Sequence, residues 1–347
     1  MSIPETMIAI AISTPGAPEV LRPVTTAVPP CADDQVLVRI AAAGVNGPDL
    51  AQRAGHYDPP PGASPLPGLE VAGEIVAVGG AVTGFSPGDR VMALTNGGGY
   101  AEYVAVPHGQ VLPIPDGWSF AEAAALPETW FTVTQTLVMR AGLLPGMSVL
   151  AHGAAGGIGG AAIQIATLLG ARAIGVVSSP EKAAYALELG ASAVIDTSRE
   201  DLPERAMALT ENLGVDRIVD LIGGDMAALN ISISARNGHI VQVSTLGGST
   251  ASVPLRTIMA KGLTLSGSTL RPQTAATKAA IADRIRTDLL PLLAQQPLRR
   301  PRVTSFPLAA AAEAHRLMES RTHLGKLVLV TAFGADAETE KGPLARA

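Results

Sequence analysis

Residues 148–182, SVLAHGAAGGIGGAAIQIATLLGARAIGVVSSPEK, decide the fold of this 347-residue chain. The stretch contains two apolar runs, 149–151 and 173–177, each with the length of a buried strand. Between them lie a glycine-rich turn, 153–159, and apolar residues at helical spacing. Strand, glycine turn, helix and strand in this order are typical of a βαβ unit that binds the pyrophosphate of a dinucleotide.

The glycine turn is a variant of the usual fingerprint, because alanine occupies the first glycine position in Ala154-x-Gly156-x-x-Gly159. Glycines let the backbone approach the phosphates, and the N-terminus of the next helix offers unpaired N–H donors with a partial positive charge. The same pattern also occurs in tight turns without a ligand. The residues expected to contact the cofactor here are Ala154, Ala155, Gly156, Gly157 and Ile158.

The end of the second strand indicates which dinucleotide binds. Sites that prefer NAD carry Asp or Glu about twenty residues after the glycines, where the acid holds the ribose hydroxyls. Here residues 176–180 read VVSSP, without an acid. Ser178 can donate to a 2′-phosphate and Lys182 adds a positive charge, so we expect NADPH. Lys182 could instead be a solvated helix lysine, and Glu181 beside it is an acid that would have to point to solvent.

The first 126 residues carry many short strand patterns punctuated by glycine and proline, which predict a β-rich, partly closed barrel. A helix is expected over residues 119–140, with Ser119 as its N-cap and Glu122 completing a capping box. From residue 148 onward, strand and helix patterns alternate, and six strands give an α/β fold with a doubly wound parallel sheet. Residues 326–330 form a last strand that returns to the first region, and the chain from 334 onward is polar and expected to fray.

Composition excludes several classes of function. The formal net charge of −5 and the charged fraction of 16% give no basic surface for nucleic acid or an anionic membrane. Hydrophobic residues are scattered, so no transmembrane segment is expected, and the N-terminus lacks the features of a signal peptide, so we expect a cytoplasmic protein. Cys31 is the only cysteine, which excludes an intrachain disulfide and a cysteine-cluster zinc site.

Four stretches make the chain similar to a known family. They are residues 46–53 (NGPDLAQR), 55–64 (GHYDPPPGAS), 123–132 (AAALPETWFT) and 220–224 (DLIGG). Together they resemble the zinc-independent quinone oxidoreductase branch of the medium-chain dehydrogenase/reductase superfamily, and within it the tumour-suppressor-inducible type. The resemblance extends over nearly the whole chain.

The resemblance implies a GroES-like catalytic domain formed by residues 1–126 and 268–332, a Rossmann NADP-binding domain at 127–267, and a flexible tail at 333–347. It also implies a homodimer in which the edge strand near 263–268 pairs across a two-fold axis, and an exposed sheet edge does need such protection. Zinc-dependent relatives have cysteine at the position of Asn46 and histidine at that of Leu69, so no metal site is expected.

The same match assigns further residues to the cofactor. Asn46 and Thr132 are placed at the nicotinamide end, Leu246 and Gly247 on the adenine-ribose side, Ser268, Leu270 and Arg271 near the nicotinamide amide or the phosphates, and Lys326 at a phosphate or ribose. Asn46 could instead be a turn residue, Thr132 could cap or pack in its helix, and Lys326 could be an ordinary surface lysine. The chain departs from some relatives at Thr197, where they have a tyrosine, and it lacks the family's second arginine after Arg271.

These residues lead to metal-free reduction of a small molecule, in which the cofactor supplies the hydride. A quinone needs little more than stacking and a donor for its developing oxyanion. Tyr57, on a loop stiffened by residues 59–61 (PPP), is the candidate to line the acceptor pocket and donate that bond, although it could be a packing tyrosine. We interpret the chain as an NADPH-dependent quinone oxidoreductase. The alternatives are an enone or enoyl reductase, which needs an acid for the α-carbon, and a non-catalytic NADPH-binding sensor.

Overall fold

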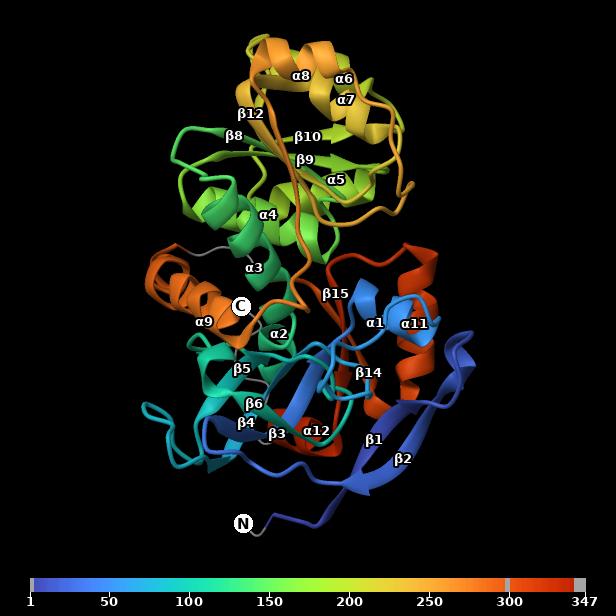
Figure 1. Cartoon of the computed structure of the whole chain (residues 1–347), viewed down its shortest axis with the longest axis vertical. Coiled ribbons are helices and arrows are strands. Elements are labelled where there is room, and N and C mark those ends of the chain that lie inside the picture. Colours follow the sequence, from blue (N-terminus) through green and yellow to red (C-terminus); the bar gives the residue numbers. More distant parts are fainter. Residues whose placement is uncertain (1–2, 297–299, 340–347) are drawn as a thin grey trace. The chain divides into compact units, whose positions relative to one another are not determined.

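The computed structural model describes residues 3–296 and 300–339 (Figure 1). The chain divides into two compact units. Unit 1 contains the described residues of Met1–Glu128, Arg271–Arg286 and Pro301–Ala347, and unit 2 contains those of Thr129–Leu270 and Thr287–Arg300. The domain boundaries implied by the family resemblance remain predictions.

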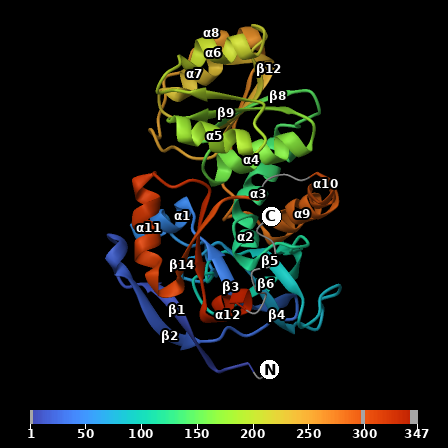
Figure 2. The same ribbon diagram turned by 180° about the vertical axis from the view of Figure 1, so that it is seen from behind.

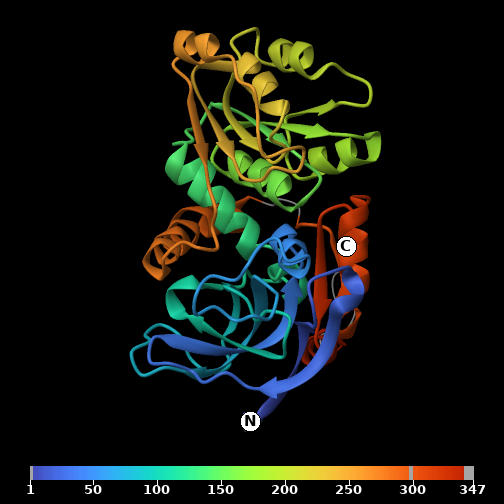
Figure 3. The ribbon, with the colours of Figure 1, turned by 45° about the vertical axis from the view of Figure 1, so that its right-hand side comes forward.

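Unit 2 is built on a six-stranded parallel sheet with the strand order β10-β9-β8-β11-β12-β13. The ribbon of this sheet is drawn in green to orange in Figure 3. The strands are β8 (Ser148–His152), β9 (Arg172–Val177), β10 (Ala193–Asp196), β11 (Val215–Asp220), β12 (Ser234–Gln242) and β13 (Thr264–Gly267). The chain winds outward from β8 in one direction and then from β11 in the other, which confirms the predicted doubly wound sheet.

Helices cover both faces of this sheet. On one face lie α4 (Gly157–Leu168) and α5 (Pro180–Glu188), and on the other lie α6 (Leu202–Leu209), α7 (Met226–Ile233) and α8 (Leu255–Lys261). Because both faces are buried, the central strands are apolar along their length, with Leu150, Ile174 and Ile218 in the core. The short helix α10 (Leu290–Gln295) also belongs to unit 2.

Unit 1 contains a seven-stranded, mostly antiparallel sheet with the order β14-β15-β3-β4-β5-β7, in which β6 also pairs with β3, and a separate β1–β2 hairpin. The strands are β1 (Thr6–Ile12), β2 (Leu21–Ala27), β3 (Gln35–Gly44), β4 (Glu70–Val78), β5 (Arg90–Leu94), β6 (Tyr103–Pro107), β7 (Val111–Pro113), β14 (Val303–Pro307) and β15 (Lys326–Val330). Strand β15 pairs with β3, so the predicted return of the chain's end to its first region is confirmed (Figure 2).

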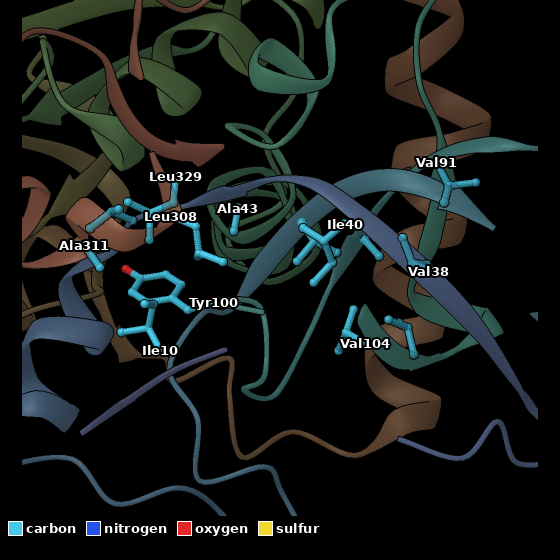
Figure 4. Packing of buried hydrophobic residues seen from close by; sticks show 14 of the residues in the cluster. Ile10, Val38, Ile40, Ala43, Val91, Tyr100, Val104, Leu308, Ala311 and Leu329 are labelled. Carbon is cyan, nitrogen blue, oxygen red and sulfur yellow. The ribbon is translucent and has the colours of Figure 1, made fainter. Parts of the chain in front are cut away.

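The core of unit 1 fills the curve of this sheet. Register shifts in the β3–β4 ladder bend the long strand β3, so that its apolar side chains meet those of β5 and β15. Figure 4 shows the packing, with Val38 and Ile40 of β3, Leu329 of β15 and the ring of Tyr100 among the buried side chains. The helices of unit 1 include α1 (Gly47–Arg53), α9 (Ala275–Arg284), α11 (Ala311–Ser320) and the short turns η1 (Pro18–Val20), η2 (His108–Gln110) and η5 (Leu308–Ala310).

The helix predicted over residues 119–140 is interrupted. It consists of α2 (Phe120–Ala123), α3 (Pro127–Val133) and a π-helical segment, η3 (Thr134–Arg140). Pro127 has no N–H to continue the bonding pattern, so α3 begins anew at this residue. The predicted capping box is confirmed, because the Ser119 hydroxyl accepts from the Glu122 N–H at 3.1 Å and the Glu122 carboxylate accepts from the Ser119 N–H at 2.8 Å.

Residues 333–339 of the predicted flexible tail belong to helix α12 (Ala332–Thr339). The ring of Phe333 lies 6.1 Å from that of Phe120 between centroids, and the guanidinium of Arg39 lies 4.1 Å from its centroid. Gly334 lies so close to Ala41 that a Cβ would come within 2.1 Å of its carbonyl oxygen. Polar composition hid these few anchoring contacts. Residues 340–347 of the predicted tail lie outside the described residues.

Candidate functional site

The glycine turn after β8 leaves the N-terminus of α4 bare. Gly156 is the N-cap and offers no side chain to the first N–H groups of the helix, which have no partner inside it. Gly159 lies so close to the end of β8 that a Cβ would be 2.4 Å from the Gly153 carbonyl oxygen. A bare helix N-terminus that closely follows a strand is suited to hold a phosphate group.

Ala154, which replaces the first glycine of the fingerprint, has a partner in the next strand. Ala154 is fully buried, and its N–H donates to the Val176 carbonyl at 3.1 Å. A Cβ added to Gly175 of β9 would lie 2.9 Å from the Ala154 Cβ. The methyl group of Ala154 therefore fits because Gly175 has no side chain.

The residues predicted to select NADPH lie together at the end of β9. Lys182 Nζ donates to Ser178 Oγ at 3.4 Å, and Ser178 is exposed. Ser179 caps α5, accepting the Lys182 N–H at 3.3 Å. Thr197 folds back on the same strand end, because its N–H and hydroxyl both lie 3.0 Å from the Val177 carbonyl oxygen. This edge thus presents one ammonium and exposed hydroxyls, without a carboxylate on the strand end itself.

The loops after β11 and β12 are bonded to each other. Leu246 and Gly247 donate to the carbonyls of Leu221 and Ile222 at 3.1 and 2.7 Å. Leu246 is largely exposed. The two residues assigned to the adenine-ribose side therefore belong to a double loop held by backbone bonds.

A buried polar network that the sequence did not reveal positions this double loop. Asp220 Oδ1 accepts from the N–H groups of Ile222 and Gly223 at 2.6 and 3.1 Å, and its Oδ2 accepts from the Asn230 amide at 3.0 Å. His152 Nε2 lies 2.8 Å from the Asn230 amide oxygen, and burial lowers the pKa of His152. Neutral His152 therefore donates to Asn230. A signal was present in the Asp-x-x-Gly pattern that ends the strand.

Three other predicted residues lie in unit 2. Thr132 is buried in α3, where its carbonyl accepts the Thr136 hydroxyl at 2.7 Å. Ser268 follows β13 and donates from Oγ to Gln135 Oε1 at 2.8 Å. Leu270 is buried at the end of the unit. Their assigned contacts with the cofactor remain predictions.

Unit 1 contains a buried polar cluster, which consists of Asn46, Asp49, Glu70, Glu128 and Lys326. Lys326 Nζ lies 2.6 Å from Glu70 Oε1 and donates to Asn46 Oδ1 at 2.5 Å. The Asn46 amide in turn donates to Glu70 Oε1 at 2.8 Å, and the Glu128 N–H donates to Glu70 Oε2 at 2.9 Å. Lys326 is therefore not an ordinary surface lysine, and its assigned contact with a phosphate or ribose remains a prediction.

The fold makes room for Glu70 at one glycine. A Cβ on Gly44 would lie 2.0 Å from Glu70 Oε1. The cluster lies at Asn46 and beside Leu69, the two positions at which the family resemblance places the ligands of zinc-dependent relatives, and the ammonium of Lys326 compensates the charge of Glu70 here. Among the described residues, no group of three or more His, Cys, Asp or Glu is placed to hold a metal ion.

The two other carboxyls of the cluster have raised pKa values. Burial raises the pKa of Asp49 to about 6. The N–H groups of Gly68 and Asn46 have the opposite effect, because they donate to the carboxylate and stabilise its charged form. Burial and then the charge of Glu70 raise the pKa of Glu128 to about 8. Glu128 thus carries a proton at neutral pH. Asp49 and Glu128 were both missed as candidates from the sequence.

Tyr57 and Arg271, far apart in the sequence, lie together in unit 1. The Arg271 guanidinium is 5.5 Å from the Tyr57 ring centroid, and its Nε and Nη2 donate to the Asn96 carbonyl at 3.2 and 2.9 Å. Lys278 Nζ donates to the Arg271 carbonyl at 2.7 Å and to the Asn96 side chain. Tyr57 is half-buried, and burial raises its pKa. Tyr57 is therefore protonated at neutral pH and can donate a hydrogen bond.

Comparisons with known proteins match both parts of the chain. Residues 32–116 match the alcohol dehydrogenase GroES-like domain family, and residues 157–284 match the zinc-binding dehydrogenase family. A quinone oxidoreductase of Pseudomonas aeruginosa is 35% identical over 300 residues, which make up 85% of this chain and 91% of that protein.

Two solved structures share the fold over nearly the whole chain. The Escherichia coli quinone oxidoreductase in complex with NADPH has a TM-score of 0.79 and 30% identity, and covers 94% of this chain and 99% of its own. The CurK enoyl reductase has a TM-score of 0.80 and 25% identity, with coverages of 94% and 100%. In the described part of the chain, no helix is long and apolar enough to cross a membrane.

Proposed function

The chain belongs to the quinone oxidoreductase family of the medium-chain dehydrogenase/reductase superfamily, and from this premise we propose that it reduces quinones with NADPH. The observation that carries the proposal is the bare N-terminus of α4 after the glycine turn, in a chain similar to an NADPH-bound quinone oxidoreductase. The residues at the end of β9 support the choice of NADPH over NADH.

The residues of unit 2 fit this cofactor. The N–H groups at the start of α4 would hold the pyrophosphate, and Gly159 keeps the turn free of side chains. Ser178 and Lys182, already within hydrogen-bonding distance of each other, would hold the 2′-phosphate with charge-assisted bonds. When bound, NADPH supplies the hydride, so the protein has to bind, orient and provide protons.

The residues of unit 1 fit a carbonyl acceptor. Tyr57 offers a flat ring and a protonated hydroxyl, and the guanidinium of Arg271 beside the ring favours electron-rich oxygens. Such donors stabilise the negative charge that develops on an oxygen of the acceptor during reduction. No bound metal is needed for this step, because the acceptor's charge is taken up by hydrogen bonds.

The test is oxidation of NADPH, followed at its absorbance band, with an ortho-quinone as acceptor and with NADH in parallel. We expect quinone turnover with a strong preference for NADPH. Binding of NADPH is measured separately by fluorescence quenching. Tight binding of NADPH without reduction of the quinone would reject the activity and favour the sensor alternative.

An enone or enoyl reductase is the second candidate. The CurK enoyl reductase shares the fold over nearly the whole chain. Its class of reaction needs a protonated donor, such as Tyr57, that delivers a proton to the α-carbon. A small enone in the same assay separates the two, because turnover of the enone without turnover of the quinone would select this candidate.

We also propose that the chain forms a homodimer through β13. Among the described residues, this strand is the last of its sheet and pairs only with β12, and Leu265 on it is 43% exposed. Such an edge is protected when it pairs with a second copy. Sedimentation of the wild type and of the Leu265→Lys variant tests this. The proposal is rejected when both proteins sediment as monomers.

A further inference from the structure

Glu128 is a buried carboxyl that the proposed chemistry has not yet used. The residue is 8% exposed, and its carboxyl oxygens form no hydrogen bond or ion pair with any residue that the structure describes. Its backbone N–H is bonded to Glu70. A carboxyl on so buried a residue, without a partner among the described residues, is a candidate for a functional role.

The surroundings keep this carboxyl neutral. Burial contributes most to the raised pKa of Glu128. The charge of Glu70, on β4, contributes next, and Asp49 of α1 adds a further negative group. The cations that face it are Lys326 of β15 and Lys278 of α9. Both ammonium groups are already bonded elsewhere. That of Lys326 is bonded to Glu70 and Asn46, and that of Lys278 to the Arg271 carbonyl. Glu128 is therefore an O–H donor without an acceptor at neutral pH.

Two further donors near Glu128 also lack acceptors. The charge of Glu128 acts on both Tyr57 and Arg271, so the three groups lie within electrostatic reach of one another. Nη1 of Arg271 is buried and has no hydrogen-bond partner in the described structure. No hydrogen bond of the Tyr57 hydroxyl to a described residue is found either. These donors lie in one neighbourhood of unit 1, and a carbonyl oxygen is an acceptor that each of them can bind.

We propose that Glu128 donates the proton that completes reduction of the acceptor, with Tyr57 and Arg271 orienting the acceptor's oxygen. This inference rests on the proposed function. The acceptor gains two electrons and one hydrogen as the hydride that the bound cofactor supplies. The O–H bond of Glu128 then breaks and its proton passes to the acceptor's oxygen, which becomes a hydroxyl. The carboxylate left behind faces Lys278 and Lys326 and takes a proton back from water.

The experiment compares wild type with Glu128→Gln, Tyr57→Phe and a surface control, Glu313→Gln. Gln has the shape of the neutral carboxylic acid, so the variant is expected to fold, and a thermal melt checks this. Turnover with a quinone is measured against pH at saturating NADPH. Infrared spectroscopy of the enzyme without acceptor follows the carbonyl stretch of protonated carboxyls over the same pH range, which is a readout independent of activity.

In wild type and Glu313→Gln, we expect turnover to fall about tenfold per pH unit above about pH 8, as the donor loses its proton. Glu128→Gln should bind NADPH normally, turn over about 10²-fold more slowly and lose this pH dependence. Tyr57→Phe should keep it. An infrared band that titrates near pH 8 in wild type should be missing from Glu128→Gln.

Either of two activity results would overturn the inference while the proposed function stands. One is a pH profile of Glu128→Gln that matches that of wild type, and the other is a pH break that disappears in Tyr57→Phe instead. An ionised Glu128 at neutral pH in the infrared spectrum also rejects it, whatever the activity. Absence of quinone turnover in wild type would reject the proposed function itself, and the donor role with it.

Discussion

The glycine turn of unit 2 and the polar cluster of unit 1 are built in opposite ways. The turn uses backbone groups and small residues within a single stretch, 153–159, and its chemistry comes from a helix N-terminus. The cluster joins side chains of β4, β15, α1 and α3 that are up to 280 positions apart, as for Lys326 and Asn46. Its chemistry comes from buried charges that compensate one another. The first region should be sensitive to added volume, and the second to altered charge.

Removing the cation from the polar cluster should have the largest effect. Lys326→Met leaves the fully buried Glu70 without its ion-pair partner, and breaking a buried pair in this way costs about 3–5 kcal/mol. Chemical denaturation measures the free energy of unfolding. The double variant Lys326→Met/Glu70→Gln should regain part of the loss, because no uncompensated charge remains. A single variant within about 1 kcal/mol of wild type would show that Glu70 is not charged in the folded state.

The raised pKa of Glu128 makes stability depend on pH. Its pKa is raised from an ordinary 4.5 to about 8 in the folded state, so the folded protein holds this proton more tightly than the unfolded chain does. The stability contributed by this proton is complete below about pH 4.5 and is lost as the pH rises to about 8. Glu128→Gln removes the dependence, so its stability relative to wild type should increase over this window and then level off.

Urea denaturation of both proteins at several pH values tests this prediction, with Glu313→Gln as the control. A constant difference between wild type and Glu128→Gln across the window would mean that Glu128 ionises normally. In that case Glu128 would no longer support the contrast between a cluster that depends on charge and a turn that depends on shape.

The glycine turn should respond to volume instead. Gly175→Ala would place a Cβ 2.9 Å from the Ala154 Cβ, and overpacking of this kind costs about 1–3 kcal/mol. Ala154→Gly restores the usual fingerprint and removes the clash, so the double variant should recover most of the stability and of the affinity for NADPH. Thermal melts and NADPH titrations of the three variants check this. Additive losses in the double variant would show that the two methyl groups do not compete for one space.

The same contrast explains what could be predicted from the sequence. The βαβ unit, the six parallel strands, the capping box at Ser119 and the returning last strand all follow from local patterns, and each is found in the structure. Asn46, Arg271 and Lys326 were named from the family resemblance and Tyr57 from its place on the proline-rich loop, but the partners of these residues were not predicted. No local pattern places Glu70 beside Lys326, or leaves Glu128 unpaired.

Two features differ from what the sequence predicted, and their origins differ. The tail was expected to be flexible because residues 334–347 are polar, whereas a single ring, Phe333, and a close approach at Gly334 attach helix α12 to unit 1. The helix over 119–140 was expected to be continuous although Pro127 interrupts it. Contacts between residues distant in the sequence form both the polar cluster and the end of the chain, and such contacts cannot be predicted from a single sequence.

The smallest expected effect concerns the choice of cofactor at the edge of unit 2. Lys182→Ala removes a partly exposed cation from the group expected to hold the 2′-phosphate, and solvent screening limits its contribution to about 1 kcal/mol. The Kd for NADPH should therefore rise about fivefold while that for NADH stays unchanged. Ser178→Ala tests the hydroxyl in the same way, and Glu181→Gln serves as the control. Equal losses for both cofactors would mean that this edge acts through the shape of α5, as the glycine turn does, and not through charge.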